Sequence, residues 1–148
     1  MRHLKHRHQL GVKKEHRMAL MANLATQLII HTRIKTTLAK AKALRPFVEK
    51  IVTLSVHARK ATPARAVYLR RRAVARLRNK QAVKVLFDER AESFLDRPGG
   101  YTRIYKIGQR RGSAAEMALI EFVEAVEAAP ATPEKTESEA PPKDSASS

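Results

Sequence analysis

The chain has 148 residues, a formal net charge of +16 and no cysteine, which excludes a disulfide framework and thiolate chemistry. Residues 1–112 carry 28 basic and 6 acidic side chains, a net charge of +22, whereas residues 113–148 carry 2 and 8, a net charge of −6. A compact body with that positive charge repels itself unless a polyanion neutralises it, so nucleic acid is the expected partner.

Residues 1–12 are expected to form a basic RNA-binding arm, because they are rich in Arg, Lys and His and show no apolar period. His3, His6 and His8 have a spacing that could indicate a metal site. Cationic residues lie between them and the first carboxylate is Glu15, so neither a metal nor another cofactor is expected. The segment is interpreted as an arm that orders against RNA, and the alternative is a flexible tail.

Two helices with a short strand between them are predicted next. The first helix, about Lys13 to His31, has an apolar stripe at three- and four-residue steps made by Met18, Met21, Leu24, Ala25 and Leu28. The β-branched residues over 31–36 predict the strand. Thr36 or Thr37 can cap the second helix, whose buried stripe contains Leu44, Phe47, Val48, Ile51 and Leu54. Pro46 lies inside that pattern and is expected to kink the helix or to start a new one.

A third helix is predicted to begin at Thr62-Pro63, with the threonine as N-cap and the proline at the first helical position. Leu69, Ala73 and Leu77 form a narrow apolar line, and much of the remaining surface is arginine. No acid lies at the neighbouring helix positions to pair with these arginines, so the face is expected to contact RNA rather than to be merely solvated.

Asn79 is expected to break the third helix. The fourth helix is predicted to bury Val83, Leu86, Phe87, Ala91 and Phe94. Its acidic residues, Asp88, Glu89 and Glu92, are interpreted as surface carboxylates rather than as a catalytic acid–base pair.

A basic hairpin is predicted to follow. Pro98-Gly99-Gly100 forces a turn, and the β-branched and aromatic residues over 101–107 predict a strand. A glycine-flanked loop over 108–112 then carries two arginines, which suits a phosphate backbone, although an ordinary solvated hairpin turn is the alternative. Residues 114–126 are ambiguous, because Ala and Glu favour a helix but the nearly continuous apolar run suits a buried strand. The preceding hairpin-like loop favours the strand.

The expected fold class is therefore α+β, with about four helices packed with a small mixed sheet of about three short strands. A single domain over 13–126 would lie between the arm and a disordered acidic tail over 127–148, which is rich in Pro, Ser, Ala and Glu. No phosphate-binding loop or nucleophile-turn motif is present, so neither an enzyme nor a small-molecule substrate is expected. The longest apolar run is short and interrupted, so no membrane association is expected and the protein is expected to be cytoplasmic.

Four segments carry a family resemblance: Met-Arg-His-Leu-Lys-His-Arg at 1–7, Asn-Leu-Ala-Thr at 23–26, Ile-Lys-Thr-Thr-Leu-Ala-Lys-Ala-Lys at 34–42 and Asp-Arg-Pro-Gly-Gly-Tyr-Thr-Arg-Ile at 96–104. Over roughly residues 1–124 the chain resembles the bacterial large-subunit ribosomal protein L17 family. The resemblance implies a structural constituent of the bacterial large ribosomal subunit that supports translation. It also implies binding to large-subunit ribosomal RNA beside neighbouring ribosomal proteins, near the outer end of the peptide exit tunnel.

Gln109 departs from the family pattern, in which proline is expected at this place in the arginine loop. The alternative function is a free-standing basic regulator that binds DNA or RNA. The side chains expected to contact RNA are Arg2, His3, Lys5, His6, Arg7, Lys13, Lys14, Arg17, Lys35, Lys40, Lys42, Arg45, Arg65, Arg70, Arg71, Arg72, Arg76, Tyr101, Arg103, Tyr105, Lys106, Arg110 and Arg111.

The acidic tail is expected to make no contact with RNA. Truncation after Ala128 should leave ribosome binding unaltered, because the tail has the same sign of charge as RNA. Non-specific RNA affinity should rise modestly, since a competing anion has been removed. Sedimentation with large subunits and binding to a random RNA duplex would measure the two effects. Loss of ribosome binding would show that the tail contributes contacts of its own.

Overall fold

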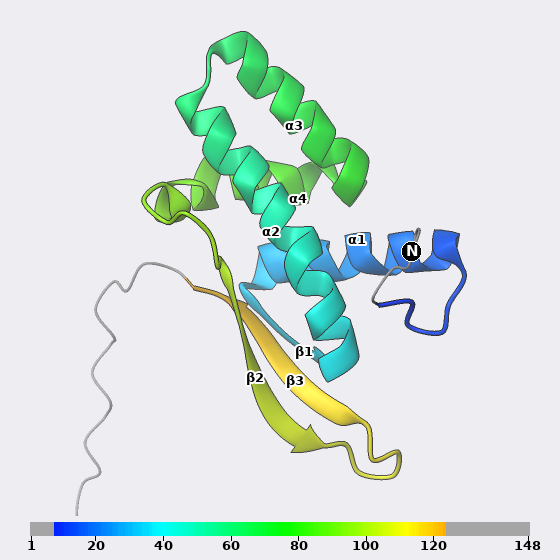
Figure 1. Cartoon of the computed structure of the whole chain (residues 1–148). Coiled ribbons are helices and arrows are strands. Elements are labelled where there is room, and N and C mark those ends of the chain that lie inside the picture. The colour runs from blue at the N-terminus through cyan, green and yellow to red at the C-terminus, as the bar shows by residue number, and fades with distance from the viewer. Residues whose placement is uncertain (1–7, 124–148) are drawn as a thin grey trace, which may run out of the picture.

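The computed structural model describes residues 8–123, which form an α+β fold with four α-helices and three strands (Figure 1). The elements in chain order are α1 (Lys14–His31), β1 (Arg33–Thr37), α2 (Leu38–Lys60), α3 (Pro63–Leu77), α4 (Lys80–Lys84), β2 (Thr102–Gln109) and β3 (Glu116–Phe122). A π-helix, η1 (Val85–Arg90), continues α4, and a 3₁₀-helix, η2 (Glu92–Phe94), follows it. Within residues 8–123 no helix has the length and apolar character needed to cross a membrane.

The sheet has β3 at its centre, in the order β1-β3-β2, and both pairings are antiparallel. Thr36 lies opposite Ala118 in one pair, and Ile104 lies opposite Ile120 in the other. The α+β class is confirmed, but the expectation of a mixed sheet is wrong. β3 runs back after the hairpin turn and lies between β1 and β2. β1 and β2 run in the same direction, but β3 separates them, so they do not pair with each other. The strand prediction within 114–126 is confirmed by β3.

An aliphatic core surrounds α2. Leu44, Val48 and Ile51 of α2 are fully buried, in one cluster with Leu28 of α1 and Ile120 of β3. α2 contacts α1, α3, η1, η2 and all three strands, so it is the element that the others share. In Figure 1 the helices gather at one end of the molecule, and the hairpin of β2 and β3 extends away from them.

Aromatic rings close the core where the helices meet the sheet. Phe94 of η2 lies 5.4 Å from Tyr101 in an edge-to-face arrangement and 5.6 Å from Phe122 of β3, measured between ring centroids. All three rings are buried. This contact fixes the start of the hairpin against the helical part of the fold.

Two helical positions differ from the sequence-based expectation. Met18 was expected in the core but is 50% exposed, because the packed stripe of α1 begins one turn later at Met21. Pro46 was expected to kink the second helix or to start a new one, yet α2 continues through it without interruption. Proline has no N–H to donate to the backbone carbonyl one turn earlier. Pro46 lies on the exposed side of the helix, so that carbonyl is not buried in the core.

The predicted helix boundaries are largely confirmed. Thr37 and Thr62 occupy N-cap positions with extended backbone and Pro63 is the first residue of α3, although neither threonine side chain makes a capping hydrogen bond. Asn79 ends one helix and begins the next: Arg78 closes α3 in the left-handed conformation, and Asn79 Oδ1 accepts a hydrogen bond from the Ala82 backbone N–H at 3.0 Å. The expected fourth helix is real but changes from α to π geometry at Val85.

Replacement of Asn79 by Ala should lower the free energy of unfolding by about 1 kcal/mol, because the Ala82 N–H loses its acceptor. Asn79→Asp should retain stability, since a carboxylate can accept the same hydrogen bond. Urea unfolding of the three proteins would compare them. Equal losses in the two variants would argue against a capping role for this side chain.

Candidate nucleic-acid interface

The arginines of α3 form one of the basic surfaces predicted from the sequence. Arg65, Arg71, Arg72 and Arg76 are all exposed on this helix, outside its buried line of Leu69, Ala73 and Leu77. The Arg72 guanidinium lies 5.8 Å from the ring centroid of Tyr68, which is itself 52% exposed. This face therefore offers RNA both positive charge and an aromatic ring.

Arg70 is different, because it faces the protein. Its Nη2 lies 2.5 Å from Asp88 Oδ1, and its guanidinium lies 5.3 Å from the ring centroid of Phe87. The sequence correctly shows no acid within α3 that could pair with its arginines, but the tertiary fold brings Asp88 to Arg70 from η1. The Arg70 guanidinium is therefore engaged in contacts within the protein, with Asp88 and Phe87.

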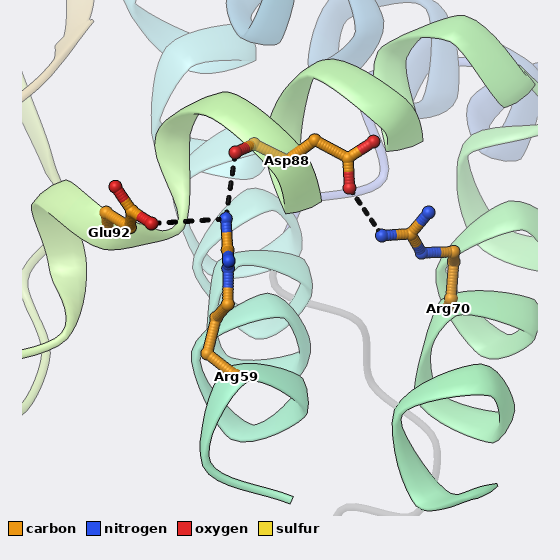
Figure 2. Close-up of polar contacts among 4 residues, drawn as sticks. All are labelled: Arg59, Arg70, Asp88 and Glu92. Atoms are coloured by element: carbon orange, nitrogen blue, oxygen red, sulfur yellow. Dashed lines mark hydrogen bonds and ion pairs between the residues drawn. The ribbon is translucent and has the colours of Figure 1, made fainter. Parts of the chain in front are cut away.

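Arg59 of α2 makes the companion contact. Figure 2 shows its Nη2 between the backbone oxygen of Asp88, at 2.8 Å, and Glu92 Oε1, at 3.6 Å. Asp88 and Glu92 thus join η1 and η2 to α3 and α2. This agrees with their interpretation as surface carboxylates.

The strand register creates a second basic surface on the face of the sheet away from α2. Lys35, Leu119 and Tyr105 lie in one row across the three strands. Arg33, Glu121 and Arg103 lie in the next row. The alternate positions, such as Ala118 and Ile120, are buried on the opposite face, whereas Arg33, Lys35, Arg103 and Tyr105 are exposed.

This open face joins cations to an aromatic ring. Arg103 Nη1 donates a hydrogen bond to Tyr105 Oη at 3.2 Å, and that contact raises the pKa of Arg103 above its ordinary value. Arginine is protonated at physiological pH in any case, so this contact orients the charge rather than creating it. Arg33 was not among the predicted RNA contacts. Residues two apart in a strand lie on the same face, so the predicted strand could have shown that Arg33 lies beside Lys35.

Tyr101 does not belong to the interface. It was expected to contact RNA, but it is only 4% exposed and packs edge-on against Phe94. It lies at the base of the hairpin, where its neighbour Thr102 is also buried and donates a hydrogen bond to Glu49 Oε1 at 3.0 Å. Burial in the core removes the ring from any RNA surface, and Tyr105 is the tyrosine of β2 that remains accessible.

The loop between β2 and β3 holds Arg110 and Arg111, at the opposite end of the molecule from α3 (Figure 1). β2 extends through Gln109, so the loop begins later than the predicted start at Gly108. The strand pairing is irregular between Lys106 and Gly108. Arg110 Nε donates to Ser113 Oγ at 2.8 Å. Its backbone N–H donates to the Ala115 carbonyl at 2.9 Å, so the loop holds one arginine in place while Arg111 is exposed.

The remaining predicted cations lie along the first two helices and β2. Lys13 and Lys14 are exposed at the start of α1, and Arg17 lies close to the backbone oxygen of Gln9, at 3.4 Å. Lys40 is half-buried. A hollow of about 360 Å³ contains further cations and is lined by His8, Leu38, Lys42, Arg45, Ile104 and Lys106.

The predicted arm contacts Arg2, His3, Lys5, His6 and Arg7 lie outside the described residues. The structure therefore brings the predicted cations to three surfaces: α3, the open sheet face with the hairpin tip, and the exposed side of α2 beside α1. Each surface combines exposed charge with apolar or aromatic groups, as RNA-binding surfaces do.

Comparison with known proteins gives consistent matches. The family model described as Ribosomal protein L17 matches residues 20–123, more than half of the chain. A relative from Opitutus terrae, named Large ribosomal subunit protein bL17, is 58% identical over 125 residues, which are 83% of this chain and 73% of the relative. Relatives with the same name are 52% identical over 124 residues in Methylacidiphilum infernorum (84% of this chain, 89% of the relative) and 46% identical over 140 residues in Azorhizobium caulinodans (95% and 96%).

Arg70 and Arg71 are adjacent and provide a matched pair of variants. Arg71→Gln should lower the slope of log affinity against log salt by roughly 0.7 to 0.9 if it meets a phosphate, with unchanged stability. Arg70→Gln should change that slope less and should lower the free energy of unfolding by about 0.5 kcal/mol, because it breaks an ion pair between half-exposed side chains. Salt-titrated binding to large-subunit ribosomal RNA and urea unfolding would separate the two effects. An equal loss of slope in both variants would contradict the inward role of Arg70.

Proposed function

The chain belongs to the ribosomal protein L17 family, and from this premise we propose that it stabilises the folded RNA of the bacterial large ribosomal subunit by contacting it through several basic surfaces. It is a structural component of that subunit and not an enzyme. The family match over residues 20–123 carries the assignment to the subunit. The net charge of +22 over residues 1–112 supports RNA as the partner that the protein contacts directly.

The protein acts by neutralising the charge of RNA phosphates and by matching the shape of the folded RNA. Each cation that meets a phosphate releases counterions, so a body with many exposed arginines gains affinity from the backbone of any RNA. Selectivity for one place in the subunit then depends on the relative positions of the surfaces. The hairpin tip lies at one end of the molecule and α3 at the other (Figure 1), so the protein can bridge RNA segments that only the folded subunit brings to this spacing.

Further parts of the proposal follow from sequence and family. Residues 1–12 act as an arm that binds RNA, residues 13–126 act as the single domain, and residues 127–148 do not contact RNA. The family resemblance supports a position near the outer end of the peptide exit tunnel, beside neighbouring large-subunit proteins.

Sedimentation tests the proposed function. The full chain should remain in the large-subunit peak of a sucrose gradient after a high-salt wash, because many contacts must be lost together before it dissociates. A chain with Arg110→Gln and Arg111→Gln should dissociate at lower salt, since the hairpin contact is weakened. A chain with Lys80→Gln and Lys84→Gln, both on the exposed surface of α4, is the charge-matched control for two lost cations. A wild-type chain found only in the ribosome-free fractions would instead favour a free-standing regulator.

A further inference from the structure

A hollow of about 410 Å³ lies between α1 and α2, and the expected RNA contacts that line it, Arg17 and Arg76, do not account for its apolar part. One stripe of α1 provides Arg17, Met18 and Met21, and one stripe of α2 provides Pro46, Phe47 and Lys50. Both sets have the three- and four-residue spacing of a single helix face, so the two helices turn these faces toward a shared space.

The floor of the hollow is apolar and part of it is accessible. Met18 is 50% exposed, Phe47 is half-buried against the core, and Met21 is buried beneath them. An aromatic ring beside two thioethers is a surface on which a flat apolar group can stack. In a chain with only seven Phe and Tyr residues, an accessible ring at the bottom of a hollow is unusual.

The rim is cationic. Arg17 of α1, Lys50 of α2 and Arg76 of α3 line the same hollow, and no acidic side chain is among the residues that line it. Three helices thus bring positive charge to one opening. An occupant that joins a flat apolar group to a negative charge would match both the floor and the rim.

Pro46 is exposed and lines the hollow. Because proline has no backbone N–H, the carbonyl of Lys42, one turn earlier on the same helix, lacks its usual helical donor. Lys42 itself lines the neighbouring hollow.

We propose that this hollow receives an unstacked nucleotide of large-subunit ribosomal RNA, with its base on Met18 and Phe47 and its phosphates at the cationic rim. The inference rests on the proposed function and deepens it, because it adds recognition of an unpaired nucleotide to neutralisation of the backbone. The RNA strand would continue past His8, which lines both this hollow and the neighbouring one that contains Lys42, Arg45 and Lys106.

Two segments of the chain itself are weaker occupants. Residues 1–7 end beside His8 but are basic, so Arg17, Lys50 and Arg76 would repel them. Residues 124–148 are acidic and could meet the rim, but they contain no aromatic side chain to stack on the floor. A nucleotide provides the charge and the flat group together.

A photo-crosslinking side chain tests this occupancy in the assembled subunit. A benzophenone amino acid replaces Met18 in the full chain, the chain is assembled into large subunits in cells, and the subunits are irradiated. The expected result is one dominant reverse-transcription stop at an unpaired nucleotide of the large-subunit RNA. The same group at Lys84 should give no such stop. A crosslink to a protein, to residues 1–7 or 124–148 of the same chain, or to nothing would overturn the inference.

Binding to an RNA fragment that contains the crosslinked nucleotide gives a second readout. Lys50→Met should weaken binding by about tenfold through loss of a charged contact, whereas Lys84→Met should change it by less than about twofold. Removal of only the base at that nucleotide should weaken binding of the wild-type chain by about tenfold or more. Equal affinity for the intact and abasic RNA would overturn base recognition. Failure of the wild-type chain to enter large subunits would instead count against the proposed function.

Discussion

The packing of α2 against the rest of the chain is the interaction on which this structure depends. Its buried residues Leu44, Val48 and Ile51 form the surface shared by the other helices and by one face of the sheet. The core is aliphatic apart from a few aromatic rings, and it must hold together a body that repels itself electrostatically. Leucine, isoleucine and valine suit this purpose because their burial removes apolar surface from water and adds no charge.

Ion pairs within the described part of the chain neutralise only a few of its cations. Asp88 forms an ion pair with Arg70, and Glu92 forms one with Arg59. These contacts connect η1 to α3 and η2 to α2. Ion pairs between exposed side chains contribute only about 0.2 to 1 kcal/mol each, so they orient elements more than they stabilise the fold. The arginines of the outer α3 face have no such internal partner among the contacts of residues 8–123. The few acids of the body thus help to shape it, and under the proposed function RNA neutralises the remaining charge.

The positions of the basic surfaces explain how a protein without a catalytic site can be selective. The central position of β3 sets one face of the sheet against α2 and leaves Arg33, Lys35, Arg103 and Tyr105 on the other. The hairpin carries two arginines beyond the helices, and α1 and α2 leave a hollow with a cationic rim. A random duplex can meet the exposed cations of any one surface, but it offers no unpaired nucleotide to the hollow. A folded RNA that satisfies all of them must also match the distances between them.

The sequence by itself determined the local features. The Thr62-Pro63 start of α3, its narrow buried line and the break at Asn79 depend on backbone preferences and helical period, which neighbouring residues set. The uneven charge and the motifs that resemble the family also lie in the sequence. The tertiary structure alone decided which face of each element is covered. It buried Tyr101 against Phe94, exposed Met18, turned Arg70 to Asp88 and placed β3 between two strands that a mixed sheet would have paired. These outcomes depend on residues far apart in the chain, so the period of a short segment cannot reveal them.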